Sequence, residues 1–305
     1  MAIITLAELV EDASRLGVSI GAIVRAREAE QSGRAEDDLN SDMQERLGVM
    51  RSAVSCGLRG VRSRSGLTGG DGPRMAAARL KTSTICGEPL DSAMAYALAV
   101  AEVNASMGRI VAAPTAGSCG VLPGVLLSVG ERLCVDDSAL VEALFTAGGV
   151  GAVIERSSTL SGAAAGCQAE CGSAAAMAAA AAVQLAGGSP GTCSHAVALA
   201  FKGLLGLVCD PVAGLVEVPC VKRNATSVAV ALAAADMALA GIRSVIPADE
   251  VIEAMGSIGR ALPPSLRETA LGGLAVTPTG KKLALELESN KEELPPEGEP
   301  ACRRG

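Results

Sequence analysis

Residues 168–185 read QAECGSAAAMAAAAAVQL, and nine of these eighteen residues are alanine. The pattern is helical, and the chain carries no charge from Cys171 to Phe201. Across all 305 residues, 49% are hydrophobic, 36 are glycine, and the aromatic residues are only one Tyr and two Phe. A core built from small aliphatic side chains lets backbones approach closely, which suits helices packed on helices. We therefore predict an all-α fold.

Helical patterns recur along the rest of the chain, whereas alternating strand patterns are scarce. A capping box at Thr5 predicts a helix to about Glu30, and a second at Ser41 predicts one to about Val54, with a polar linker at 31–40 between them. Further helical patterns cover 91–107, 123–129, 138–145, 168–185, 195–205, 226–240, 249–258 and 265–270. We expect one compact helical domain over residues 1–285, with glycine-rich loops entering its centre, followed by a charged tail at 286–305 that is disordered or loosely docked.

Charge and composition exclude several classes of protein. The 26 Lys and Arg residues against 33 Asp and Glu give a net charge of −7, which argues against binding to nucleic acid because phosphate recognition needs basic patches. Mean hydropathy is +0.38, yet the charge-free runs are interrupted by polar residues or prolines, so we expect no membrane span. The first residues lack a basic segment and are followed by acidic ones, unlike a signal peptide. A cytoplasmic protein is the expectation.

Three of the ten cysteines have unusual local settings. Cys167 follows a Gly/Ala-rich loop and enters a helix, where the helix N-terminus favours thiolates. Cys209 and Cys220 flank a connection that Pro211 and Pro219 hold out of a helix. Three thiolates on rigid loops are able to bind a metal and leave one position open for catalysis. The spacing matches neither a ferredoxin nor a zinc finger, so cysteines that serve only as small core residues remain the alternative.

A set of motifs then resembles a known family, the iron–sulfur-dependent L-serine dehydratases (L-serine ammonia-lyases), and within it the alpha chain of the two-subunit form. The resemblance runs from about residue 5 to about residue 285. It is carried by GLTGGDG (66–72), YALAVAEVNASMG (96–108), APTAGSCGVLPG (113–124), GCQAECG (166–172), LLGLVCDPVAGLVEVPCVKRNA (204–225) and ETALGGLAVTPTG (268–280).

The resemblance implies a helical catalytic domain that releases pyruvate and ammonia from L-serine with a [4Fe–4S] cluster as cofactor. The implied cluster ligands are Cys167, Cys209 and Cys220, and an open iron would act as a Lewis acid on the substrate hydroxyl. A separate beta subunit is implied as partner in a hetero-oligomer. Two glycine-rich loops, which contain GLTGGDG (66–72) and PTAGS (114–118), are expected to hold the substrate carboxylate through backbone N–H groups and hydroxyls. The residues concerned are Thr68, Gly69, Gly70, Thr115, Gly117 and Ser118.

Several roles stay open at this point. Asp71 is the expected partner of the substrate ammonium. The general base is unknown; the sole histidine, His195, is expected at the start of a helix as an ordinary surface or core residue. Cys171 is a competing ligand or a packed helix residue. Because some members of the family carry a cysteine near the C-terminus at the open cluster position, the resemblance also makes Cys302 in the tail a candidate for that role. A related lyase acting on cysteine or threonine, and a non-catalytic helical scaffold, are the alternative functions.

Overall fold

The computed structural model describes residues 5–81 and 84–289, and over these ranges the chain forms α-helices and short 3₁₀ or π turns without a β-strand. The predicted all-α fold is confirmed. The helices in chain order are α1 (Leu6–Leu16), α2 (Ile20–Ser32), α3 (Glu36–Leu58), α4 (Asp71–Leu80), α5 (Leu90–Ala105), α6 (Val121–Leu133), α7 (Asp137–Ser157), α8 (Gly162–Ala165), α9 (Ser173–Leu185), α10 (Pro190–Lys202), α11 (Cys220–Leu239), α12 (Ala248–Ala261) and α13 (Pro278–Ser289).

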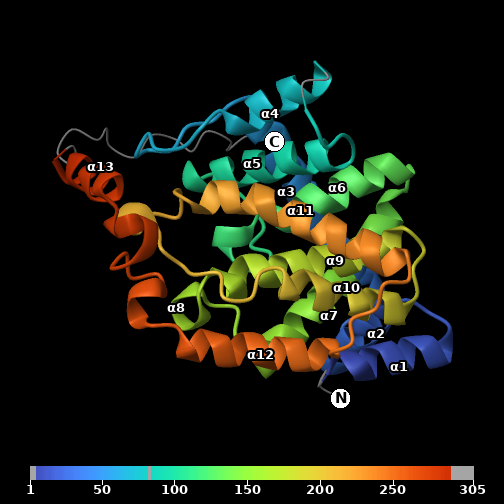
Figure 1. Cartoon of the computed structure of the whole chain (residues 1–305). Helices are drawn as coiled ribbons and strands as arrows, with labels where there is room; N and C mark the ends of the chain where they lie inside the picture. Colours follow the sequence, from blue (N-terminus) through green and yellow to red (C-terminus); the bar gives the residue numbers. More distant parts are fainter. Residues whose placement is uncertain (1–4, 82–83, 290–305) are drawn as a thin grey trace.

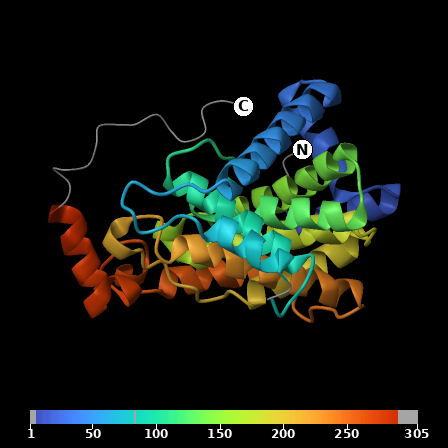
Figure 2. The same cartoon turned by 90° about the horizontal axis from the view of Figure 1, so that it is seen from above.

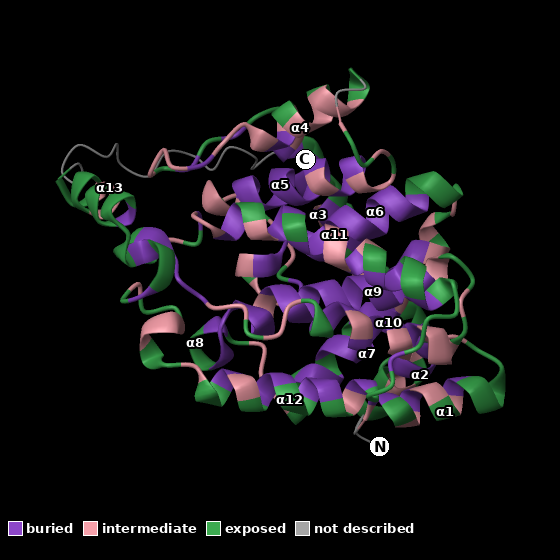
Figure 3. Cartoon of the chain, in the orientation of Figure 1, coloured by how far each residue is buried: buried purple, intermediate pink, exposed green. Residues whose placement is uncertain are grey.

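Helix α9 is the axis around which the core is built (Figure 1). It packs against α6, α7, α10 and α11, and every residue from Ser173 to Val183 is buried. Figure 3 shows this helix as buried along its length. Alanine side chains keep the helix narrow, so its neighbours approach its backbone closely on all sides.

Helix α5 forms a second centre, packed against α3, α4, α6 and α11. Here glycine allows direct contact between backbones. A Cβ added to Gly57 of α3 would lie 2.2 Å from the Ala99 carbonyl oxygen, and one added to Gly120 would lie 2.3 Å from that of Ala97. A side chain at either position would collide with α5, so these glycines fix α3 and the loop before α6 against it.

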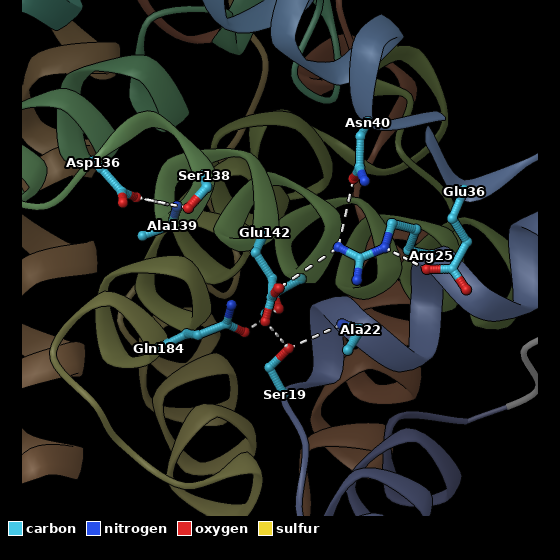
Figure 4. A network of polar contacts seen from close by, with 11 residues as sticks. Ser19, Ala22, Arg25, Glu36, Asn40, Asp136, Ser138, Ala139, Glu142 and Gln184 are labelled. Carbon is cyan, nitrogen blue, oxygen red and sulfur yellow. Dashed lines mark hydrogen bonds and ion pairs between the residues drawn. The ribbon is translucent and has the colours of Figure 1, made fainter. Parts of the chain in front are cut away.

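A polar network joins the N-terminal helices to α7 (Figure 4). The Arg25 guanidinium lies 2.8 Å from a Glu36 carboxylate oxygen and 3.6 Å from one of Glu142, and it stacks 5.7 Å from the centre of the Phe145 ring. Ser19 caps α2 and also donates a 2.6 Å hydrogen bond to Glu142. The network connects α2, α3 and α7 at the side of the core away from α13 (Figures 1 and 4).

The N-terminal helix prediction is wrong in its boundaries. The predicted helix is interrupted at Gly17, whose left-handed conformation (φ 67°) ends α1. Ser19 then caps a separate helix, α2. Helix α3 begins at Glu36 inside the predicted linker and continues through Ser41, where a start was expected. Acidic residues in its first turn, Glu36, Asp37 and Asp38, favour this earlier start through the helix dipole.

Other boundaries also differ. The predicted helix at 265–270 is a 3₁₀ turn, Pro264–Leu266, followed by two residues with positive φ. Helix α10 begins at Pro190 because Ser189 caps it, which places His195 in mid-helix rather than at the start. Helices α4 and α13 were not predicted, and α13 extends four residues past the expected domain limit at 285. The remainder of the tail, with Cys302, lies outside the described residues.

Helix α7 is long and apolar enough to cross a membrane by length and composition, but 67% of its apolar window is buried inside the fold. It packs against α2, α3 and α9, as a core helix does. Helix α13, by contrast, lies at one end of the molecule and is largely exposed (Figures 2 and 3).

Candidate active site

Three separate segments bring Cys167, Cys209 and Cys220 into the interior. Cys167 precedes a π-helical turn at Gln168–Gly172, Cys209 lies in the connection after α10, and Cys220 is the first residue of α11. Their exposed fractions are 3%, 3% and 8%. Cys167 and Cys209 pack together with Cys171 and Leu207. Turns of the π type inside helical proteins are frequent at functional sites.

Gln168 fixes the first two cysteine segments to each other. Its side chain is fully buried; the amide nitrogen donates to the carbonyl oxygens of Ala165 and Met255, and the amide oxygen accepts from the Gly206 N–H at 2.9 Å. The Gln168 N–H also donates to the Leu207 carbonyl at 3.0 Å. The turn after Cys167 and the residues just before Cys209 are therefore held as one unit.

The three thiols lie within range of each other's charge. Burial, then the charge of Cys167, raises the pKa of Cys220 to about 12. Burial raises the pKa of Cys209 still further, with contributions from Cys167 and Cys220. A hydrogen bond with Cys171 lowers the pKa of Cys167. Among residues 5–81 and 84–289, no group of three His, Cys, Asp or Glu side chains is arranged to hold a single metal ion.

A cationic side chain, Arg223, lies close to these thiols. Arg223 lies on the first turn of α11, forms an ion pair with buried Asp210 at 2.8 Å, and donates to the Val208 carbonyl at 2.9 Å. Burial opposes its charge, but Cys167 and Asp210 raise its pKa above the ordinary value. Arg223 therefore places a positive charge close to Cys167 and Cys220.

The first glycine-rich loop, at 66–72, is bound mainly to protein groups. Buried Glu217 accepts hydrogen bonds from Ser65 at 2.7 Å and from Thr68 at 3.0 Å. At the start of α4, the N–H groups of Asp71 and Gly72 donate to the buried carboxylate of Glu102.

Asp71 itself has two cationic partners. Its carboxylate pairs with Lys222 at 2.5 Å and with Arg74 at 2.8 Å. Burial would raise the pKa of Asp71, but these two cations lower it below its ordinary value. The carboxylate predicted to meet a substrate ammonium is therefore already neutralised by side chains of the same chain.

The second glycine-rich loop, at 113–120, lies against the cysteine segments. Asn224 on α11 is buried; its side-chain oxygen accepts from the Gly120 N–H at 2.9 Å, and its nitrogen donates to the carbonyls of Gly117 (2.8 Å) and Cys220 (2.9 Å). One amide side chain thus joins this loop to the segment of Cys220. Within the loop, the hydroxyls of Thr115 and buried Ser118 lie 3.2 Å apart.

Glu170 lies between this loop and the cysteines. Its carboxylate accepts a 2.8 Å hydrogen bond from the Thr115 hydroxyl. A Cβ added to Gly117 would lie 3.2 Å from Oε1, and one added to Gly162 would lie 2.6 Å from Oε2 and 3.3 Å from the Cys209 sulfur. Burial raises the pKa of Glu170, the Thr115 hydrogen bond opposes this, and the charge of Glu268 adds to it.

Comparison with known proteins identifies the family of this chain. The sequence profile of the serine dehydratase alpha chain matches residues 15–275. The chain belongs to the serine dehydratase alpha chain family. It is 50% identical over 280 residues to a protein named probable L-serine dehydratase, alpha chain, of Bacillus subtilis (strain 168), covering 92% of this chain and 93% of that one. It is 41% identical to the L-serine dehydratase alpha chain of Peptoniphilus asaccharolyticus, covering 92% and 96%.

In this member of the serine dehydratase family, the predicted site residues fall into two groups. Thr115, Gly117 and Ser118 lie beside Glu170 and the segment of Cys220, whereas Thr68 and Asp71 contact Glu217 and Lys222. Gly69 and Gly70 have positive φ values of 145° and 80° in the turn that leads into α4.

Glu170, Glu217 and Asn224 were not predicted from the sequence as site residues. Glu170 is the only carboxylate in the GCQAECG motif, and this was the one available signal. The side-chain partners of Glu217 and the two loop partners of Asn224 lie more than 100 residues away in the chain, so no local pattern marks these two residues.

Proposed function

We propose that this chain is the catalytic alpha subunit of an L-serine dehydratase, which converts L-serine to pyruvate and ammonia. Its support is the burial of three thiols within range of each other's charge, on segments that hydrogen bonds of Glu170 and Asn224 join to the loop at 113–120, in a chain of this family. The substrate would lose its Cα proton to a base and its hydroxyl as water, giving an enamine that tautomerises and is hydrolysed.

The donor set fits a [4Fe–4S] cluster held by Cys167, Cys209 and Cys220. In such a cluster each thiolate binds a different iron, so the sulfurs need not meet at one point as they would around a single ion. Arg223 supplies a positive charge beside the anionic group. When bound, the cluster would supply an iron with an open position that acts as a Lewis acid toward the substrate hydroxyl.

The second glycine-rich loop is the better supported of the two substrate-binding loops. Thr115, Gly117 and Ser118 lie on a loop that Asn224 joins directly to the segment of Cys220. We propose that this loop binds the substrate carboxylate through its hydroxyls and N–H groups. Thr68, Gly69 and Gly70 are proposed to complete the site from the other loop. The two cationic partners of Asp71 weigh against its predicted pairing with the ammonium.

We further propose a separate beta subunit and a cytoplasmic location. The alpha chain designation of the relatives from B. subtilis and P. asaccharolyticus supports an enzyme of more than one subunit.

The test begins with reconstitution of the chain without air, with ferrous iron and sulfide. About four irons and four sulfides per chain are expected, with pyruvate formed from L-serine when the beta subunit is present. Cys167→Ala, Cys209→Ala and Cys220→Ala should each lose the iron-dependent colour and the activity. Cys193→Ala is the matched control, because Cys193 is equally buried but lies on α10. Full activity in iron-free protein would contradict the proposal.

Comparing L-serine with L-threonine and L-cysteine as substrates tests the alternative lyases. Faster turnover of either would reassign the substrate. Cysteine variants that keep both colour and stability would instead favour the non-catalytic scaffold.

A further inference from the structure

We infer that Glu170 is the group that binds the ammonium of the amino-acid substrate. The inference rests on the proposed function, and it replaces Asp71 in the role predicted from sequence. Three features of the described residues carry it: the position of the carboxylate, the space left around it, and the balance of charge.

The position follows from the size of the substrate. L-Serine carries its carboxylate and ammonium on one carbon and its hydroxyl on the next, so the three groups that bind them must surround one small volume. The Glu170 carboxylate touches the Thr115 hydroxyl on the proposed carboxylate-binding loop. It also shares with the Cys209 sulfur the space beside Gly162. It therefore lies between the proposed partners of the substrate carboxylate and of the substrate hydroxyl.

Two glycines leave room for this carboxylate. A Cβ on Gly162 would lie only 2.6 Å from Oε2, closer than real Cβ atoms approach, and a Cβ on Gly117 would lie 3.2 Å from Oε1. Gly162 and Gly117 have ordinary negative φ values, so their conformations do not require glycine. Their small size serves to accommodate the Glu170 side chain.

The charge around Glu170 favours a cation. The Glu268 carboxylate lies close enough to Glu170 for the two negative charges to repel each other. Cys167, Cys209 and Cys220 also lie within range of the Glu170 charge, and as thiolates they would add negative charge around it. The nearby Arg223 is engaged with Asp210. Asp71, the rival carboxylate, already pairs with Lys222 and Arg74. A substrate ammonium would give Glu170 the cationic partner that Asp71 already has.

The experiment measures steady-state kinetics of the reconstituted enzyme with its beta subunit, comparing wild type with Glu170→Gln. The substitution keeps the shape of the side chain and an acceptor for Thr115, but removes the charge. We expect KM for L-serine to rise by about 30-fold or more, as for loss of one partner from a buried charge pair. The iron content and visible spectrum should match wild type. Glu268→Gln removes a neighbouring, exposed carboxylate and should change KM by less than about threefold.

Two competitive inhibitors separate ammonium binding from general damage to the site. Ethanolamine keeps the ammonium and hydroxyl of serine, whereas 3-hydroxypropionate keeps the hydroxyl and carboxylate. Glu170→Gln should weaken inhibition by ethanolamine at least about tenfold and leave 3-hydroxypropionate as good or better. Glu170→Asp retains the charge and should fall between wild type and Glu170→Gln.

The outcomes are distinct. An active, cluster-loaded Glu170→Gln enzyme with unchanged KM overturns the inference alone. A large loss of kcat with KM and ethanolamine inhibition unchanged also overturns it, and assigns Glu170 to proton transfer. Equal weakening of both inhibitors points to a structural role and overturns it too. If Glu170→Gln does not fold, Glu170→Ala takes its place, and an unchanged KM in that variant overturns the inference. A wild-type enzyme without lyase activity overturns the proposed function itself.

Discussion

The two glycine-rich loops, at 66–72 and 113–120, are similar in composition but have different surroundings. In the loop at 66–72, Thr68 binds Glu217, Asp71 binds Lys222, and the first N–H groups of α4 bind Glu102. In the loop at 113–120, Thr115 faces Glu170, and Asn224 joins the loop to Cys220. The polar groups of the first loop are therefore bound to other side chains of the protein, whereas the second loop lies next to the cysteine segments. Glycine-rich composition alone does not distinguish a loop that supports a site from one that borders it.

Asn224 should give the largest effect on stability. Asn224→Ala removes three hydrogen bonds and leaves the buried Gly120 N–H and two carbonyls without this partner. We expect the free energy of unfolding of the apo chain to fall by about 3 kcal/mol, measured by urea denaturation. Thr226→Ala, at an exposed position on the same helix, is the control and should change it by less than about 1 kcal/mol. Equal effects would show that Asn224 is not the link between loop and cysteine.

Glu217 is the corresponding test of the first loop. Glu217→Ala removes the acceptor for Ser65 and Thr68 inside a buried site, and should lower the free energy of unfolding by about 2 kcal/mol. Glu217→Gln keeps an acceptor oxygen and should recover at least half of that loss. Urea denaturation of both variants checks this. If the glutamine variant is no better than alanine, the charge rather than the hydrogen bonds holds the loop.

Gly117 tests the second loop through substrate binding. Gly117→Ala places a methyl group about 3.2 Å from Glu170 Oε1 and should raise KM for L-serine about tenfold, a change of about 1.4 kcal/mol. The free energy of unfolding should change by less than about 1 kcal/mol. Gly148→Ala, with open space around its added Cβ on α7, is the control for adding a methyl group to a glycine. An unchanged KM for Gly117→Ala would separate this loop from the substrate.

The smallest effect concerns Asp71 and pH. Because its pKa is lowered in the folded chain, its ion pairs stabilise the fold above the ordinary pKa of 3.8, and this stabilisation is lost as pH falls through the folded value. Asp71→Asn should therefore lower the free energy of unfolding by less than about 1 kcal/mol at pH 7. The difference from wild type should shrink as the pH is lowered from 5 toward 3. A difference that grows on acidification would contradict the ion-pair assignment.

Much of the fold was predictable from local pattern, because alanine-rich helical segments and scarce strand patterns already favour an all-α chain. The errors came from residues with competing local signals: Gly17 ended a helix that periodicity would continue, and three acidic residues started α3 before the capping box at Ser41. For the site, the settings of Cys167, Cys209 and Cys220 were visible in the sequence. Their neighbours Glu170, Glu217 and Asn224 depend on contacts between distant segments, which sequence spacing does not encode.

The central helix has a consequence for how this chain tolerates mutation. The alanines of α9 are buried against α6, α7, α10 and α11, so an added methylene would overpack the core and force neighbouring side chains or backbone to shift. Polymorphism along α9 should consequently be confined to exchanges among the smallest residues. The exposed face of α13 is not packed against a neighbouring helix, so it should accept nearly any hydrophilic replacement.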